Sequence, residues 1–324
     1  MFRQMYARLV HGILGVGLLA FAAPMFASTN LGHPGVINYV EGQVSVNGSS
    51  VTPKTVGSAD VQAGQVLETT QGKAEVLLTP GVLLRVGNES AVRMDNPGLT
   101  DTQFSVLKGE AMVEVNLLYK TNNIHVHDGS ANVTLLKKGL YAFNGTRPAI
   151  SVFDGEAQVQ EDGRQVTVKK GKDLSLDDST FKTAKFDRDQ HDDLYNWSSL
   201  RSQYLAQASA ESARTYVVNG GPWLGAGWYW NPWFSMYSFI PGDGFLYSPF
   251  GWGFYSPAYI GYSPFYSGRY YGRLGYVAPV RGRVYGATPA VRGGVAANVR
   301  SSGFAAHSFA GGGFGGHIGG GRGR

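Results

Sequence analysis

Short alternating strands constrain the fold of this chain more than any other feature of its sequence. From Val36 to Leu176 apolar and polar residues alternate, as in QVSVNG at 43–48 and MVEVN at 112–116. A period of two, interrupted by Asn-Gly, Pro-Gly and Asp-Gly dipeptides, is typical of half-buried β-strands joined by tight turns. No 12-residue stretch of this region has a clean helical stripe of apolar residues. The sequence therefore predicts an all-β domain with strands of about five to seven residues.

A glycine recurs at the start of several of these strands. The pattern Gly-(Glu/Gln)-(Ala/Val) occurs at Gly42, Gly109 and Gly155, and a looser copy lies at Gly72. Glycine permits a bend, so each copy is expected to begin a new strand. The spacing between copies is too irregular for a strict repeat array. It favours a solenoid-like or jelly-roll stack of short strands.

Several segments have the order of strands and turns of a known domain. They are GQVL at 64–67, AEVLLTPGVLLRVGNESAVRM at 74–94, VLKGEAMVEV at 106–115, SANVTLLKKGLYAF at 130–143, SVFDGEAQV at 151–159 and VTVKKGKDLSL at 166–176. Over residues 34–178 the chain resembles the FecR domain of bacterial envelope proteins. The usual Gly-Thr-x-Phe element is replaced by GLYAF at 139–143, which keeps the aromatic pair Tyr141 and Phe143. The resemblance implies a β-domain that recognises a protein partner, as FecR domains do in iron-uptake regulation.

The N-terminus differs from that of the signalling members of this family, which place a sigma-factor-binding segment and a membrane helix before the domain. Here Arg3 and Arg8 precede an apolar run at 12–23, which Pro24 and the small residue Ala27 follow. This order is typical of a secretory signal peptide, and the run is shorter than the roughly 20 residues of a membrane-spanning helix. We expect cleavage after residue 27 and a mature chain in the periplasm, outside the cell or on the surface of a bacterium. An uncleaved anchor is the alternative, and direct anti-sigma regulation is not expected.

Composition divides the chain into two parts and excludes several chemistries. The chain has no cysteine, which excludes disulfides, cysteine-ligated zinc, iron–sulfur clusters and a thiol nucleophile. Residues 28–200 carry more acidic than basic side chains, whereas residues 201–324 hold ten arginines and only two acids, Glu211 and Asp243. An acidic body and a basic C-terminal part are therefore expected.

A helix is predicted between these two parts, over residues 187–213. Leu194, Trp197, Arg201 and Leu205 recur at helical spacing, and aspartates in the first turn favour the positive end of the helix dipole. We expect the apolar stripe to dock on the β-domain. A helix that binds a partner protein is the alternative.

Aromatic residues are concentrated after this helix. Residues 216–276 contain 22 of them among many Gly, Pro and Ser residues. We expect residues 219–276 to be mobile or only partly docked, and the Gly/Arg-rich residues 277–324 to be disordered. Aromatic and arginine side chains here are candidates for contacts with a cell surface or with sugars. These candidates are Trp228, Tyr229, Trp230, Trp233, Trp252, Arg269, Tyr270, Tyr271 and Arg273.

Signatures of catalysis are missing from the sequence. It contains no G-x-S-x-G elbow, no H-E-x-x-H and no P-loop. His125 and His127 share one face of an expected strand but lack a third metal ligand nearby, and the aspartates at 187–193 do not match an EF-hand. We therefore expect no catalytic residue, no bound metal and no cofactor.

The sequence as a whole predicts a non-enzymatic exported envelope protein without a stable transmembrane segment in its mature form. Its β-domain is expected to bind an envelope protein, and its aromatic and Gly/Arg-rich segments to contact an anionic surface or a polysaccharide. Export argues against nucleic acid as the partner, although the Arg/Tyr/Gly pattern suits single-stranded nucleic acid. A FecR-type signalling or assembly module with a specific protein partner is the alternative, and an envelope enzyme with dispersed catalytic residues is a third hypothesis.

Overall fold

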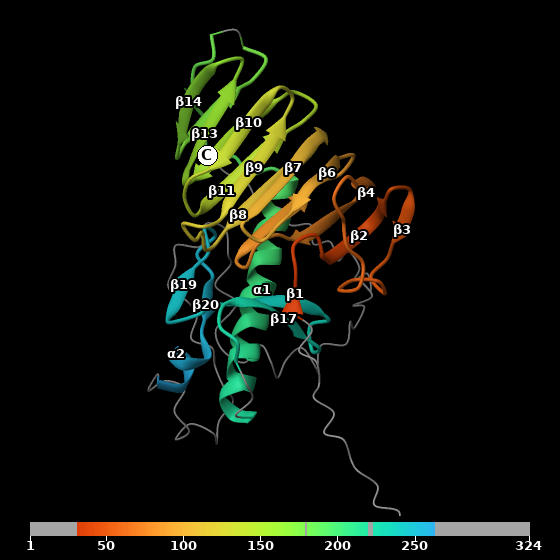
Figure 1. Cartoon of the computed structure of the whole chain (residues 1–324), viewed down its shortest axis with the longest axis vertical. Helices are drawn as coiled ribbons and strands as arrows, with labels where there is room; N and C mark the ends of the chain where they lie inside the picture. Colours follow the sequence, from red (N-terminus) through yellow and green to blue (C-terminus); the bar gives the residue numbers. More distant parts are fainter. Residues whose placement is uncertain (1–30, 179, 220–222, 263–324) are drawn as a thin grey trace, which may run out of the picture.

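The computed structural model describes residues 31–178, 180–219 and 223–262. Strands make up about half of this part of the chain, and one long helix, α1 (Asp193–Asn219), follows the main sheet (Figure 1). The predicted all-β class with one helix after the strands is thereby confirmed. The expected signal peptide, residues 1–27, and the expected disordered tail, residues 277–324, lie outside the described residues.

The main sheet contains 15 strands. They are β2 (Ile37–Val46), β3 (Ser49–Val51), β4 (Val66–Leu77), β5 (Val82–Val86), β6 (Ala91–Pro97), β7 (Asp101–Lys108), β8 (Glu110–Val115), β9 (Asn123–Asp128), β10 (Ala131–Leu135), β11 (Gly139–Asn144), β12 (Ala149–Asp154), β13 (Glu156–Glu161), β14 (Arg164–Lys169), β15 (Lys172–Ser175) and β16 (Ala184–Lys185). Within these ranges β7 and β9 pair in parallel, and the other pairs are antiparallel.

This sheet folds over, so that its two halves face each other. Its hydrogen-bonded order is β14-β13-β10-β9-β7-β6-β4-β5-β8-β11-β12-β15-β16. Strand β14 nevertheless contacts β12 and β15, which lie near the opposite end of that order. The long strand β4 joins the halves, because residues 66–68 pair with β6 and residues 74–77 pair with β5. Apolar residues of both halves form one core between an outer layer (β6, β7, β9, β10, β13, β14) and a helix-side layer (β5, β8, β11, β12, β15).

The recurring glycine marks the corners where the chain passes from one layer to the other. Strand β8 begins directly after Gly109 and β13 directly after Gly155, as the repeat predicts. Strands β2 and β4 run through Gly42 and Gly72, and the β2–β4 register shifts after Gly42. Gly109 and Gly155 have φ values of 70° and 98°, a left-handed backbone that favours glycine. The glycine of this sequence pattern therefore provides the bend at which the chain passes between the two layers.

Replacing Gly155 by alanine is expected to lower the free energy of unfolding by about 1–3 kcal/mol, from left-handed strain and overpacking. A methyl group at this position would clash with the buried Tyr141 hydroxyl, which also accepts a hydrogen bond from the Glu156 amide. Gly163→Ala is the matched control, because Gly163 also has a positive φ but has no neighbour within 4 Å of an added Cβ. Urea unfolding of both variants measures the difference. Equal losses would contradict the role of Tyr141.

Helix α1 covers the helix-side layer. It begins at Asp193 and not at Asp187, because Asp192 Oδ1 accepts a hydrogen bond from the Tyr195 amide at 2.6 Å and caps the helix there. Leu194, Trp197, Arg201 and Leu205 lie on its buried face at helical spacing. The helix contacts β5 and β8 of the main sheet. This buried face, which also holds four serines, is the side by which the helix docks on the β-structure.

Residues 223–262 fold onto the same side, which differs from the mobile or partly docked segment expected from the sequence. Their elements are β17 (Gly227–Asn231), β18 (Met236–Ile240), β19 (Phe245–Tyr247), β20 (Gly253–Tyr255) and α2 (Pro257–Tyr262), and β17 also pairs with β1 (Leu31–Gly32). Trp228, Phe239 and Phe254 share one apolar cluster with Leu77 of β4 and Leu83 of the helix-side layer. Besides its core face, that layer carries apolar side chains on the side turned toward α1, and these supply the partner surface that offsets the cost of ordering a Gly-rich segment.

Candidate functional site

A buried charge cluster joins the helix-side layer to α1. On β5, Arg85 donates from Nε to Glu75 Oε2 on β4 at 2.9 Å and from Nη1 to Glu114 Oε2 on β8 at 2.6 Å. From α1, Arg201 Nη2 donates to Glu75 Oε1 at 2.9 Å. The side chains of Glu75, Arg85 and Glu114 are fully buried. The charge cluster, defined as these four residues, holds two cations and two anions and is electrically balanced.

Neutral side chains supply further donors to the carboxylates of the cluster. Ser202 Oγ donates to Glu114 Oε1 at 2.8 Å, and Asn38 Nδ2 donates to Glu75 Oε1 at 3.0 Å. Asn38 Oδ1 in turn accepts from the Tyr237 amide on β18 at 2.7 Å. All four carboxylate oxygens therefore have a donor. The cluster ties β2, β4, β5, β8, α1 and β18 together at one place.

The electrostatics of the cluster suit docking and not acid–base catalysis. Burial alone would raise the pKa of Glu75, but the cations of Arg201 and Arg85 outweigh burial and lower the pKa. Glu75 thus contributes stability above the usual glutamate pKa, and this contribution is lost as the pH falls through the lowered value. Since both carboxylates are engaged by cations, neither is available as a general base.

An exposed aromatic patch lies on β19, β20 and α2, of which β20 and α2 pack against α1. The aromatic patch consists of Phe245, Tyr247, Tyr255 and Tyr259. The Phe245 ring centroid lies 4.9 Å from that of Tyr259, 5.5 Å from that of Tyr247 and 6.4 Å from that of Tyr255. Phe245, Tyr247 and Tyr259 are 45%, 41% and 36% exposed. The rings hold one another in place, and part of Phe245, Tyr247 and Tyr259 faces solvent, whereas Tyr255 is buried.

The scaffold under this patch is packed. Phe245 and Tyr255 are cross-strand partners in the β19–β20 hairpin. Tyr255 and Ile260 form an apolar cluster with Ala210 and Ala213 of α1. In Figure 1 the hairpin and α2 lie beside the C-terminal half of α1. The patch is therefore presented by elements anchored to the helix.

The tryptophans predicted to contact sugars divide into buried and exposed residues. Trp228 is 1% exposed and donates from Nε1 to the Leu78 carbonyl at 3.0 Å, and Tyr229 is also buried. Their assignment as surface contacts is wrong, because both side chains pack in the protein interior. Trp252 is partly buried between the apolar cluster that contains Trp228 and a second one that contains Trp197 of α1. Trp230 is exposed and covers Gly57, and Trp233 is 75% exposed.

The other predicted contacts belong to the C-terminal part of the chain. Arg269, Tyr270, Tyr271 and Arg273 lie outside the described residues. The aromatic patch, in turn, was absent from the sequence-based candidates. Its signal in the sequence was the FLY triplet at 245–247, which places two rings on one face of a strand.

Two of the residues weighed as metal ligands in the sequence, His125 and Asp193, have other partners. His125 and His127 lie on one face of β9, and His125 Nδ1 is 3.1 Å from Thr134 Oγ1. Asp193 pairs with Lys73 at 2.8 Å. Over residues 31–262, apart from the gaps at 179 and 220–222, no group of three or more His, Asp or Glu side chains could hold a metal ion. That the protein binds no metal stays a prediction.

One carboxyl group of the outer layer has an unusually high pKa. Asp128, at the β9–β10 turn, is buried, and burial raises its pKa to about 7 even though the Ala149 amide donates to Oδ2 at 3.3 Å. Its Oδ1 has no hydrogen-bond partner among the described residues. Asp128 is enclosed by the β-structure, so it offers no surface for a substrate.

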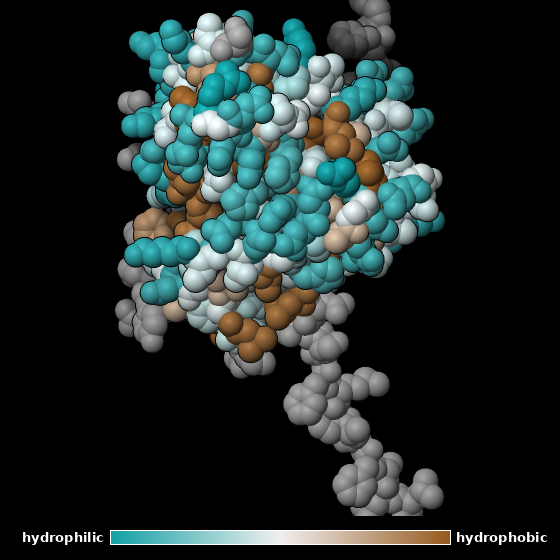
Figure 2. All heavy atoms as spheres, turned by 45° about the horizontal axis from the view of Figure 1, so that its top comes forward, coloured by the Kyte–Doolittle hydropathy of each residue, from teal (hydrophilic) through white to brown (hydrophobic). Residues whose placement is uncertain are grey.

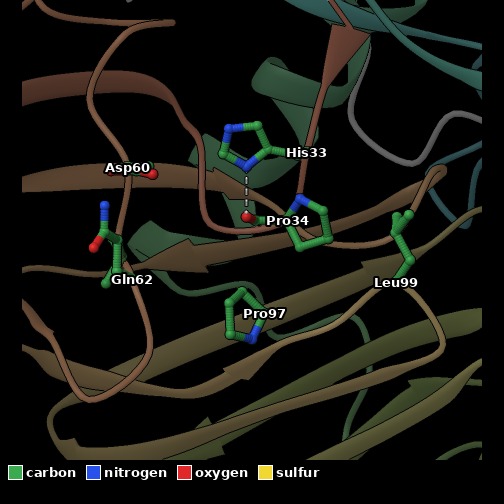
Figure 3. A pocket seen from close by; sticks show the side chains of 7 residues that line it. His33, Pro34, Asp60, Gln62, Pro97 and Leu99 are labelled. Atoms are coloured by element: carbon green, nitrogen blue, oxygen red, sulfur yellow. Dashed lines mark hydrogen bonds between the residues drawn. The ribbon is translucent and has the colours of Figure 1, made fainter.

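A shallow hollow of 460 Å³ lies where β1, the loop before β4 and the end of β6 meet. His33 and Pro34 lie on one side, Pro97 on the other, and Gln62 and Leu99 at its two ends (Figure 3). His33 Nδ1 is 3.0 Å from the Pro34 carbonyl oxygen. In the described structure His33 makes no hydrogen bond to Asp60, which also lines the hollow, so no acid–base pair is assembled there.

No family model matches the chain, and no curated protein matches it. Two crystal structures of a proposed anti-sigma factor from Parabacteroides distasonis ATCC 8503 are similar to it. One is 14% identical with a TM-score of 0.32 over 41% of this chain and 61% of that chain. The other is 13% identical with a TM-score of 0.33 over 42% of this chain and 63% of that chain. The chain thus spans less than two thirds of those proteins, and a likeness at these scores supports no statement about function.

Helix length bears on membrane association. Among the helices of the described ranges, none is long and apolar enough to cross a membrane.

Proposed function

We propose that this chain is an exported, non-enzymatic envelope protein that acts by binding another protein through the aromatic patch. The observation that carries the proposal is the exposure of Phe245, Tyr247 and Tyr259 on a scaffold anchored to α1. Aromatic residues are enriched in protein interfaces, and tyrosine is among the residue types most enriched in hot spots. Side chains that already hold one another lose less conformational entropy when a partner binds.

Further apolar residues extend the patch at the C-terminal end of α1. Val217 and Val218 are exposed there. An added Cβ on Gly261 of α2 would lie 3.8 Å from Val217, so this end of α1 adjoins the helix that carries Tyr259. Contiguous exposed apolar surface of this kind marks interaction sites.

The cellular context belongs to the same proposal and rests on the sequence. The charged, apolar and small-residue order of residues 3–27 supports export. The FecR resemblance over residues 34–178 supports a signalling or assembly module with a specific envelope protein as partner. The proposal also includes adhesion to a cell surface. The contacts would be made by Trp230, Trp233 and the Arg-rich C-terminal part.

Site-specific photo-crosslinking tests the patch. A photoreactive amino acid at Tyr247 in the intact exported chain is expected to crosslink one envelope protein in living cells. Phe245→Ala/Tyr259→Ala is expected to reduce that crosslink about tenfold or more, because it removes two interface rings of about 1–2 kcal/mol each.

Leu99→Ala/Tyr119→Ala is the matched control, because Leu99 and Tyr119 are equally exposed but lie elsewhere, and it should leave the crosslink unchanged. Loss of the crosslink in the control, or its persistence in the patch variant, would overturn the assignment of the patch. Recovery of a tagged chain in the cytoplasm would overturn the exported location.

A further inference from the structure

Between charged residues at its margins, such as Arg93, Asp101 and Glu156, one face of the outer layer carries uncharged hydrogen-bonding side chains. Strand register aligns them in two rows that cross β7, β9, β10, β13 and β14. The first row is Ser105, His127, Asn132, Gln160 and Gln165, and the second is Gln103, His125, Thr134, Gln158 and Thr167. We call these ten residues the polar ladder.

Alternation directs the ladder away from the core. Val126, Val133 and Val159, which alternate with ladder residues along their strands, are fully buried between the layers. Gln160 and Gln165 are exposed, and most other ladder residues are half-buried. Hydrophilic residues cover most of the face turned toward the viewer in Figure 2. The ladder is thus the solvent side of the outer layer.

Some ladder residues have side-chain partners, since Gln103 donates to Asp101, Ser105 donates to Asp95, and Thr134 Oγ1 lies 3.1 Å from His125 Nδ1, but other polar groups of the ladder have none. The side chains of Gln158, Gln160 and Gln165 have no hydrogen-bond partner within the described ranges. Asn132 Oδ1 is buried and also lacks a partner there. A buried acceptor without a donor costs about 1–3 kcal/mol, so a ligand hydroxyl that donates to it would be favoured.

The chemistry of the ladder selects among classes of ligand. Nucleic acid requires Lys and Arg against phosphates, and a membrane surface requires apolar and cationic side chains. A protein interface requires an apolar, aromatic centre. None of the ten ladder residues is an acid, a lysine, an arginine or an aromatic of the Phe, Tyr or Trp type. Amides, hydroxyls and imidazoles both donate and accept, which matches ligands rich in neutral hydroxyl groups.

The extent of the rows indicates a polymer. Adjacent strands lie about 4.8 Å apart, so five strands span roughly 19 Å. That length exceeds a single sugar ring and fits an extended chain of several sugars. We propose that the polar ladder binds a neutral polysaccharide laid across the strands of the outer layer. The proposal is independent of the aromatic patch and of its protein partner.

Affinity electrophoresis of the intact mature chain tests this proposal, with gels that contain laminarin, dextran or hydroxyethyl cellulose as neutral polymers and alginate as the anionic one. At least one neutral polymer is expected to retard the protein, and alginate is expected not to. Gln158→Ala/Gln160→Ala should weaken this retardation about tenfold. Gln71→Ala is the matched control, because Gln71 is an exposed strand glutamine outside the ladder. The polymer should retard this variant as strongly as the parent protein.

A second ladder variant tests the proposal independently, in case the first variant does not fold. Thr134→Ala/Gln165→Ala removes hydrogen-bonding groups from both rows on other strands and is expected to weaken retardation as well, with thermal unfolding unchanged. The proposal is overturned if no neutral polymer retards the protein, if alginate alone does so, or if both folded ladder variants are retarded like the parent. Loss of retardation in Trp233→Ala, with both ladder variants unaffected, would assign the binding to the exposed tryptophan and also overturn it.

Discussion

Replacing Arg85 by methionine is expected to lower the free energy of unfolding by about 3–5 kcal/mol. The substitution leaves Glu114 without any cation and Glu75 with Arg201 alone, inside a region from which water is excluded. An uncompensated buried charge costs far more than the net stabilisation of the pair, because its desolvation is no longer offset. Urea unfolding of the intact chain at neutral pH measures the loss.

Two further variants show whether charge balance is the cause. Arg93→Met removes an ion pair with Asp95 from the surface and should change the free energy of unfolding by about 1 kcal/mol at most. Arg85→Met/Glu114→Gln leaves Glu75 paired with Arg201 and restores neutrality. It is therefore expected to be more stable than Arg85→Met alone. A double variant that is less stable than the single one would contradict this explanation.

The fold was predictable to the extent that its signals are local. Alternation within each strand and the Gly-Glu-Ala step before β8 and β13 both act over a few residues, so the strands and the corners at Gly109 and Gly155 follow from the sequence. Strand β5 departs from alternation, since all five residues of VLLRV are buried. That departure indicates a strand covered on both faces, and an arginine within it indicates a buried partner.

The charge cluster could not be predicted, because it depends on long-range register. Glu75 faces Arg85 only once β4 and β5 pair, and Arg201 joins them from a helix 126 residues further along the chain. The polar ladder depends in the same way on the register of five strands. His125 and His127 could be placed on one face, but their neighbours Gln103 and Asn132 could not.

Folding of residues 223–262 was missed for a related reason. The composition of the segment indicates a high conformational-entropy cost of ordering its Gly, Pro and Ser residues. It does not show the apolar surface on which the aromatic residues pack. Leu77 and Leu83 belong to strands that already have one core face, so a second apolar face was not expected of them. The segment is ordered by the partner surface and not by its own propensity.

Trp228→Ala is expected to lower the free energy of unfolding by about 3–5 kcal/mol, as large-to-small substitutions of buried aromatic residues do. The indole lies at 5.6 Å, edge to face, from the Phe239 ring and packs against the helix-side layer. Its removal leaves a cavity and an unpaired Leu78 carbonyl. Thermal and urea unfolding of the intact chain measure the effect on the β-domain itself.

Trp233→Ala is the matched control from the same aromatic stretch, and with its side chain 75% exposed it should change stability by about 0.5 kcal/mol or less. The comparison distinguishes two descriptions of the segment. If it were a tail appended to an independent β-domain, both substitutions would leave unfolding unchanged. If the segment completes the core, only the Trp228 variant loses stability. The unfolding of that variant should stay a single transition, because the segment and the helix-side layer share one apolar cluster. A separate early transition that leaves the sheet folded would show that the two parts are not one cooperative unit.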